Sequence, residues 1–175
     1  MKRSFILLII LLSSLFAAPD SLVYRVPIEG TIDLGLPPFI ERSLKAAEAE
    51  GAIAVIFDID TFGGRVDAAT QIKDAILDSP LLTIAFINRR AISAGALISM
   101  SCDKIYMTSG GTIGAATAVD MQGKKGSEKV ISYMREEMAS TAESTGRNVN
   151  IAKGMVDEEL SFTHLEVDGK SIEVT

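Results

Sequence analysis

Tryptophan, histidine and cysteine are the residue types that this sequence has least of. Its 175 residues contain no Trp, one His and one Cys, and only 6% of them are aromatic. A single cysteine excludes an intramolecular disulfide, and one cysteine with one histidine is too few for a Cys/His zinc site. So small an aromatic fraction leaves little surface on which nucleobases could stack.

Positive charge is scarce as well. The chain has 17 Lys and Arg against 23 Asp and Glu, a formal charge of −6, and its basic residues form no cluster. Because binding to a phosphate backbone depends on clustered Lys and Arg, the composition argues against a nucleic-acid-binding protein. The length fits one domain, which typically has roughly 150 residues and can bury a substantial core.

The amino terminus has the pattern of a secretory leader. Lys2 and Arg3 precede an unbroken apolar run, Phe5 to Leu12, which is followed by small residues. A charged start, a short apolar segment and a small-residue end describe a signal peptide. The apolar part is shorter than the roughly 20 residues that a membrane-spanning helix needs. We predict a signal peptide at 1–18 and one exported domain at 19–175, with an uncleaved anchor as the alternative.

After the leader, strand patterns alternate with amphipathic helix patterns. The run Ala52–Ile59 has β-branched or other apolar residues at every position except Asp58, which is typical of a strand buried on both faces of a parallel sheet. Between such runs, apolar residues recur every three or four positions, as on one face of a helix. Strands are predicted at 22–32, 52–59, 81–87 and 104–107, and helices at 37–50, 66–78, 94–101 and 128–143. This alternation predicts an α/β fold with a parallel sheet and right-handed crossovers.

The remaining segments are predicted to be turns, loops or small elements. Polar or glycine-containing turns are expected at 61–64 and 88–90, and loops at 109–114 and 120–127. Asn148 is expected to cap a final helix that reaches Met155. The tail is predicted to form a hairpin around Asp168 and Gly169.

The first segment with chemical potential contains Gly63 and Gly64, directly after the strand at 52–59. In open α/β sheets, ligands bind at the carboxyl ends of the strands. Paired glycines before a helix allow a sharp turn that presents N–H groups to an anion or a developing oxyanion. The segment lacks the glycine and lysine spacing of nucleotide-binding loops. The alternative is a tight strand-to-helix turn without a chemical role.

A second candidate is Ser93, which lies between a predicted strand and the helix at 94–101. At this place a helix N-terminus can stabilise negative charge, as a serine nucleophile requires. The pattern differs from the Gly-x-Ser-x-Gly elbow of hydrolases, because only the second glycine, Gly95, is present. Alternatively, Ser93 is an ordinary N-cap.

A serine nucleophile needs a base, and the choice in this sequence is narrow. The one histidine, His164, lies in the predicted hairpin and is expected to be a surface residue. Lysine accepts a proton when burial in an apolar site lowers its pKa. The candidates are Lys124, Lys125 and Lys129, and the alternative is that all three are solvated surface charges. A Cys102 nucleophile paired with His164 is disfavoured, because Cys102 follows an apolar helix and is expected to be buried.

Six segments carry the resemblance of this chain to a known family. They are Ile28–Ile32, Asp60–Val66, Ala91–Gly95, Thr112–Ala116, Lys129–Tyr133 and Gly146–Asn148. In this order they resemble the N-terminal protease domain of NfeD proteins, the stomatin operon partner proteases of the ClpP/crotonase superfamily. The resemblance covers residues 22 to about 160. It implies a ββα spiral with a parallel sheet flanked by helices.

The resemblance also implies a serine peptidase with a Ser-Lys dyad and with neither cofactor nor metal. Ser93 matches the family's nucleophile, and Lys129 matches its base at the start of a helix. The backbone N–H groups of Gly64 and Ala94 match the oxyanion hole. The positions that match the substrate groove are Phe62, Gly63 and Gly114.

For partners, the resemblance implies a stomatin-like (band 7) membrane protein, whose apolar C-terminal segment is cleaved. It further implies a homodimer. Together with the leader, these expectations place the domain outside the cytoplasm, at a membrane surface.

Two departures from the family pattern leave other functions open. Phe62 stands where the family usually has proline, and the chain ends at Thr175 without the family's closing helix, membrane-spanning part and C-terminal barrel. These departures favour, as an alternative, a catalytically weak domain that holds an apolar peptide in the same groove. A crotonase-like acyl-CoA enzyme would share the fold, but the signal peptide argues against a cytosolic substrate.

Overall fold

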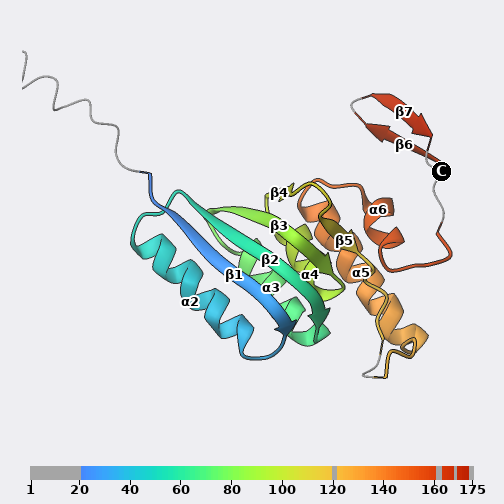
Figure 1. The fold of residues 1–175 in the computed structure, drawn as a ribbon, viewed down its shortest axis with the longest axis horizontal. Coiled ribbons are helices and arrows are strands. Elements are labelled where there is room, and N and C mark those ends of the chain that lie inside the picture. Colours follow the sequence, from blue (N-terminus) through green and yellow to red (C-terminus); the bar gives the residue numbers. More distant parts are fainter. Residues whose placement is uncertain (1–20, 120–121, 161–162, 168, 174–175) are drawn as a thin grey trace, which may run out of the picture.

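The computed structural model describes residues 21–119, 122–160, 163–167 and 169–173. The predicted signal peptide lies outside these residues, as does Asp168 in the predicted hairpin turn. The described part of the chain forms a five-stranded sheet, helices packed on it and a C-terminal hairpin (Figure 1). None of the helices in this part is long and apolar enough to cross a membrane.

The sheet is parallel throughout, as the alternating pattern predicts. Its strands are β1 (Val23–Ile32), β2 (Ala54–Gly64), β3 (Leu82–Ile92), β4 (Lys104–Met107) and β5 (Thr112–Gly114). The order is β1-β2-β3-β4, and β5 pairs with the last residues of β3. In β2, Val55, Phe57 and Ile59 share one face of the sheet and are fully buried in the core, whereas Ile56 on the other face is half-buried, so the strand is not fully buried on both faces. The predicted parallel α/β sheet is confirmed.

Three predicted turns or loops are strand in the structure. They are 61–64, 88–90 and 112–114, which form the ends of β2 and β3 and the whole of β5. The pairing register shifts between Glu29 and Thr31 and again between Ile59 and Thr61. Irregularities of this kind bend a strand without ending it. In these segments the glycine and polar residues therefore belong to bent strands, although their composition alone predicts turns.

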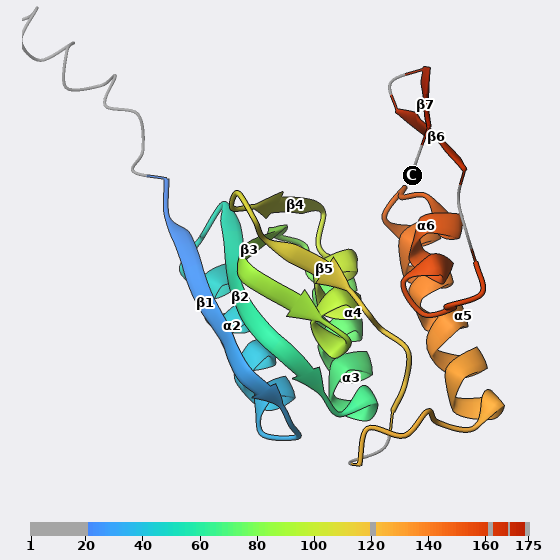
Figure 2. The ribbon, with the colours of Figure 1, turned by 45° about the vertical axis from the view of Figure 1, so that its right-hand side comes forward.

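Three helices lie on the same side of the sheet (Figure 2). They are α2 (Leu36–Ala49), α3 (Val66–Leu77) and α4 (Ala94–Ser101). Helix α2 buries Ile40, Leu44 and Ala47, whose spacing predicts this face. Helix α4 is buried at every residue, because it lies against β2, β3, α3 and α5. The start of α4 is thus held rigidly at the carboxyl end of the sheet.

The rest of the described chain comprises α5 (Glu128–Ser144), α6 (Val149–Gly154) and the antiparallel strands β6 (His164–Val167) and β7 (Lys170–Glu173). An ion pair joins α5 to α3, because Lys73 Nζ lies 2.8 Å from Glu137 Oε2. The Asn148 side chain accepts hydrogen bonds from the amides of Asn150 and Ile151, at 2.9 and 3.2 Å. The predicted cap and the helix after it are confirmed.

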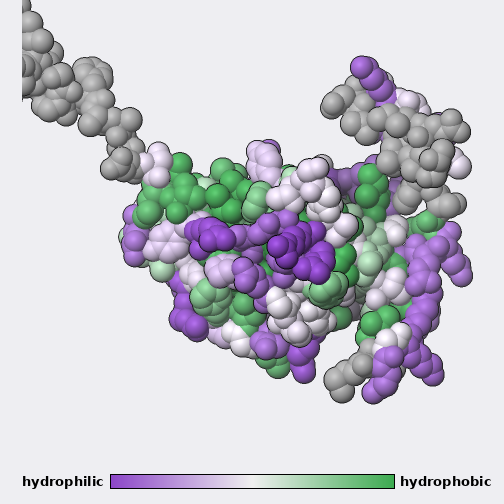
Figure 3. Space-filling model, in the orientation of Figure 1, coloured by the Kyte–Doolittle hydropathy of each residue, from purple (hydrophilic) through white to green (hydrophobic). Residues whose placement is uncertain are grey.

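Exposed apolar side chains gather at the amino end of the sheet. Val23 pairs with Ala54, which in turn pairs with Leu82. The exposed residues at this end are Leu22, Val23, Ile53 and Leu82, with exposed fractions between 38% and 58%. Figure 3 shows apolar surface beside the start of β1. We call these four residues the apolar rim; it lies at the end of the strands opposite to Gly64 and Ile92.

Candidate active site

The carboxyl ends of β2 and β3 bring the two predicted chemical segments into contact. A Cβ atom placed on Gly63 would lie 2.6 Å from Ser93 Cβ and 2.9 Å from the Ile92 carbonyl oxygen. A Cβ atom on Gly64 would lie 2.1 Å from the Ile32 carbonyl oxygen. Gly63 also has a φ of +104°, which L side chains rarely adopt. The glycine pair is therefore required because the backbone of β2 touches both β1 and the Ser93 turn.

The side chain of Thr61 holds the glycine pair in place through hydrogen bonds. Its hydroxyl donates a hydrogen bond to the Gly30 carbonyl oxygen and accepts one of 2.9 Å from the Gly63 amide. Thr61 is only 1% exposed. A Cβ atom on Gly95 would lie 2.5 Å from Thr61 Cγ2, so the glycine after Ser93 makes room for this threonine. Sequence analysis missed Thr61 as a positioning residue, although a hydroxyl two residues before the glycine pair was a signal.

Ser93 has a strained backbone, with φ 55° and ψ −117°. Its amide donates to the Gly114 carbonyl oxygen at 2.9 Å, and its own carbonyl oxygen accepts from the Ala96 amide at 2.9 Å. These bonds hold the turn, but the Ser93 hydroxyl does not cap α4. The ordinary N-cap interpretation is therefore wrong for this side chain. Positive φ at a residue other than glycine costs about 1–3 kcal/mol and concentrates at functional sites.

Ser93 lines an open cavity of about 910 Å³. Among the described residues, Ser93 and Ala115 are the two non-glycine residues with positive φ, and both line this cavity. Its wall is largely apolar. The other lining residues are Thr31, Ile32, Asp33, Phe62, Gly64, Arg65, Val66, Ile92, Thr117, Ala118, Val119 and Glu158. The structure thus places Phe62 and Gly64 beside Ser93.

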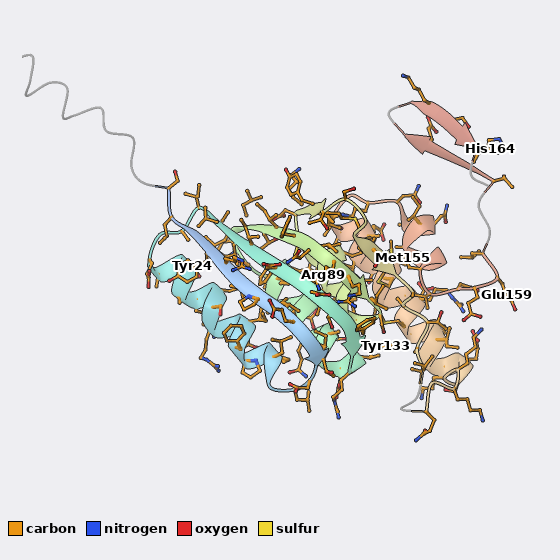
Figure 4. The ribbon with its side chains drawn as sticks, in the orientation of Figure 1. Tyr24, Arg89, Tyr133, Met155, Glu159 and His164 are labelled. Carbon is orange, nitrogen blue, oxygen red and sulfur yellow. The ribbon has the colours of Figure 1, made fainter. Side chains whose placement is uncertain are left out.

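A second cavity, of about 500 Å³, adjoins the first along the segment after β5. Ala115 and Glu158 line both cavities, and Gly114 lines the second. Met155, which Figure 4 labels, lies on the other side of this segment and accepts a 2.7 Å hydrogen bond from the Ala116 amide. Gly63 is buried beneath the Ser93 turn, so its role is to allow close contact.

The candidate lysines lie at different places. Lys129 is exposed in the first turn of α5 and is not among the residues that line either cavity. Tyr133, one turn later (Figure 4), lies 3.4 Å from the Thr70 hydroxyl of α3. Lys125 lies 3.6 Å from Glu158, which lines both cavities. All three candidate lysines are exposed, and Lys125 is joined to a residue of the cavity wall by its ion pair with Glu158.

Cys102 and His164 do not form a catalytic pair. Cys102 is fully buried at the end of α4, and this burial raises the pKa of its thiol far above the ordinary value. His164 is exposed in β6, and Figure 4 shows it on the terminal hairpin, away from the sheet. Among the described residues, no group of three or more His, Cys, Asp or Glu side chains could hold a metal ion.

We predict that iodoacetamide will alkylate Cys102 at least about 100-fold more slowly in the folded chain than in urea, because a buried, protonated thiol is a poor nucleophile. Mass spectrometry at pH 8 measures the two rates. Because this is the chain's single cysteine, no background labelling needs to be subtracted. Equal rates would show that the thiol is accessible and would reopen the cysteine mechanism.

Comparison with solved structures identifies the class of fold. The 1510-N membrane-bound stomatin-specific protease, as a lysine-to-alanine mutant with a substrate peptide, matches with a TM-score of 0.75 and 28% identity over 82% of this chain and 69% of that one. ClpP1 from Listeria monocytogenes matches with a TM-score of 0.57 and 21% identity over 78% of this chain and 80% of that one. The chain is therefore an α/β protein of ClpP-like fold.

The family follows from the sequence comparison. The family described as "NfeD1b, N-terminal domain" matches residues 22–174, and the chain belongs to this family. The membrane protein NfeD1b of Bacillus subtilis is 38% identical over 143 residues, which are 82% of this chain and 33% of that protein. The membrane-bound protease PH1510 of Pyrococcus horikoshii is 32% identical over 168 residues, which are 91% of this chain and 38% of that protein. The chain thus spans little more than a third of the length of these relatives.

Proposed function

We propose that this domain is a serine endopeptidase with Ser93 as its nucleophile. The observation that carries the proposal is the strained backbone of Ser93, which the Gly63 contact and the Gly114 hydrogen bond maintain at the wall of a cavity. Backbone strain of this kind persists where the surrounding structure holds it in place, and it concentrates at functional sites. Relatives that are named as proteases support the same conclusion.

In the proposed reaction, the Ser93 hydroxyl transfers its proton to a lysine amine as its oxygen attacks a peptide carbonyl carbon. The carbonyl electron pair moves onto the oxygen. When this tetrahedral intermediate collapses, the C–N bond breaks and the lysine returns the proton to the leaving amine. Water then hydrolyses the acyl-enzyme in the same two stages and restores the free hydroxyl of Ser93.

The proposed oxyanion hole consists of the backbone N–H groups of Gly64 and Ala94. Gly64 lines the cavity with Ser93, and Ala94 is the first residue of α4, where amides have no partner within the helix. N–H groups fixed by backbone contacts stabilise a developing oxyanion without reorganising. The contacts of Gly64 with Ile32 and of Gly63 with Ser93 supply this rigidity.

For the substrate, we propose an apolar segment of a stomatin-like membrane protein, held by an exported, membrane-associated homodimer. The named specificity of the 1510-N protease for a stomatin supports this substrate, as does the apolar lining of the cavity. Leu22 and Val23 of the apolar rim follow the predicted leader within a few residues, and the exposed apolar rim supports contact with a membrane. In that orientation the strands would point their carboxyl ends, and Ser93, away from the bilayer.

A second candidate function is peptide binding without turnover. It is favoured by the position of Lys129, which leaves no lysine among the described residues that line the Ser93 cavity. The groove itself would serve both functions. The two candidates differ in whether the Ser93 hydroxyl is activated.

The deciding experiment incubates the chain from residue 19 with a fluorophosphonate probe and, separately, with synthetic peptides from the apolar C-terminal segment of a stomatin-like protein. A peptidase is expected to be labelled once per chain, at Ser93, and to cleave the peptides. Peptide binding without labelling or cleavage between pH 6 and 10 would support the binding function and overturn the peptidase.

We predict that Lys129→Met lowers kcat/KM by about 100-fold or more, because a positioned general base contributes roughly 10²–10⁴-fold. Lys124→Met and Lys125→Met are the matched controls, which remove the same charge from the neighbouring loop. Peptide cleavage measures all three variants. Full activity of Lys129→Met would show that Lys129 is not the base. The base would then be the loop lysine whose replacement lowers kcat/KM, and Lys125 is the first candidate because of its ion pair with Glu158.

A further inference from the structure

Phe62 is unusual because it is exposed and yet fixed in place. Its exposed fraction is 71%, the largest among the large apolar residues in the described part of the chain. Even so, the guanidinium carbon of Arg90 lies 4.3 Å from the centre of its ring. A cation within about 6 Å of a ring face is held by the electrons of the ring. One face of Phe62 is therefore covered by a charged group, although no apolar core surrounds it.

Arg90 is itself held by a second contact. Its Nε and Nη2 atoms donate to the two carboxylate oxygens of Asp60, at 2.9 and 3.2 Å. This bidentate pair fixes the plane of the guanidinium. The hydrogen bonds that Arg90 donates to Asp60 lower the pKa of the Asp60 carboxyl group and raise the pKa of Arg90, so both groups remain charged. Asp60 and Phe62 come from β2 and Arg90 from β3.

The position of this cluster ties it to the nucleophile. Phe62 lines the same cavity as Ser93, and the next residue, Gly63, lies so close to the Ser93 turn that a Cβ atom on it would be 2.6 Å from Ser93 Cβ. A substrate segment that places its carbonyl group at Ser93 must pass the exposed side of the Phe62 ring. The ring is then a preformed platform for one substrate side chain.

We propose that Phe62, held by Arg90 and Asp60, determines specificity by selecting a bulky apolar side chain next to the scissile bond. This inference rests on the proposed function of the Ser93 cavity. The Asp60 carboxylate neutralises the Arg90 charge, so the cluster offers an apolar surface without a net charge. Val66 and Ile92, which are half-buried, add apolar surface to the nearby cavity wall. Phe62 is the specificity-determining residue, and Arg90 and Asp60 are positioning residues.

The test uses pairs of synthetic decapeptides that differ only in having leucine or alanine at one position, which is scanned along the peptide. For each pair, kcat/KM is measured with the wild-type chain and with Phe62→Ala. We expect one position at which leucine is preferred by about 10-fold or more, as is typical for an apolar pocket, and we expect Phe62→Ala to bring this preference close to one.

Two further variants separate specificity from general damage. Phe39→Ala removes a partly exposed phenylalanine of α2, outside the cavity, and should keep the full leucine preference. Arg90→Lys keeps the charge but loses the bidentate and stacked geometry. Arg90→Lys should lower the leucine preference about threefold, because the Phe62 ring is then held less firmly. An unchanged preference in Phe62→Ala would overturn the inference.

Failure of the proposed function gives a different result. Dissociation constants of the same decapeptides are also measured with Ser93→Ala, which cannot turn them over. If the wild-type chain is neither labelled nor active, the proposed peptidase function is overturned. The ratio of the dissociation constants of the leucine and alanine peptides still tests whether Phe62 selects the apolar side chain. If that ratio is the same with Ser93→Ala and with the double variant Ser93→Ala, Phe62→Ala, the inference is overturned as well.

Discussion

Replacing Ser93 with alanine should reduce peptide cleavage at least about 1,000-fold and abolish fluorophosphonate labelling, because no other group supplies the acyl-accepting oxygen. The substitution should change the free energy of unfolding by less than about 0.5 kcal/mol. The reason is that the Ser93 hydroxyl makes no hydrogen bond within the described residues, while the backbone bonds of the turn remain. Urea unfolding and peptide cleavage measure the two effects.

Ser140→Ala is the matched control for this variant. Ser140 is an exposed serine of α5 whose hydroxyl donates to the Glu137 carbonyl oxygen within the same helix, at 3.2 Å. Its replacement should leave labelling and cleavage unchanged. If Ser93→Ala protein were still labelled with the stoichiometry of the wild-type chain, Ser93 would not be the nucleophile.

Replacing Gly64 with alanine should lower the free energy of unfolding by at least about 3 kcal/mol and remove cleavage, because overpacking against a fixed backbone is among the costliest single changes. The added Cβ atom would lie 2.1 Å from the carbonyl oxygen and 2.7 Å from the amide nitrogen of Ile32. Ile32 is fully buried, so β1 has no free space into which it can move. Any movement that relieves the clash shifts the Gly64 N–H group away from Ser93.

Gly110→Ala is the control that separates backbone strain from collision. Gly110 has a φ of +81°, and a Cβ atom there would have nothing within 4 Å. An alanine at such a position costs about 1–2 kcal/mol from strain alone. Urea unfolding of both variants gives the comparison. A smaller loss for Gly64→Ala than for Gly110→Ala would mean that β1 and β2 separate more easily than their contact indicates.

Elements with a strong apolar period could be predicted closely from the sequence. Helix α4 was expected at 94–101 and occupies Ala94–Ser101, and the expected helix at 128–143 is α5, Glu128–Ser144. The ends of β2 and β3 could not be predicted. Polar and glycine residues at these ends predict turns. The chain stays extended there because it pairs with neighbouring strands that are remote in sequence.

In the candidate site, too, some residues could be predicted from the sequence and others could not. Ser93 and the glycine pair were found because a nucleophile and an anion cradle need particular residue types at the carboxyl ends of strands. The contribution of Thr61 was missed, since its hydrogen bond to Gly30 depends on the register shift between β1 and β2, where the extra residue lies in β2. The lysines could not be ranked, because the burial of a side chain on an amphipathic helix depends on what packs against it. The structure leaves Lys129 exposed and brings Lys125 to Glu158.

The sequence by itself determined the class of fold, the order of the elements and the residue types available for catalysis. One histidine and one cysteine left serine and lysine as the candidates, and local apolar spacing was enough to define most helices and strands. Only the tertiary structure decided how these residues act together. The strain at Ser93, the contact of Gly63 with its side chain and the Asp60–Arg90–Phe62 cluster join segments about 30 residues apart. Such contacts depend on strand register, which local sequence does not specify.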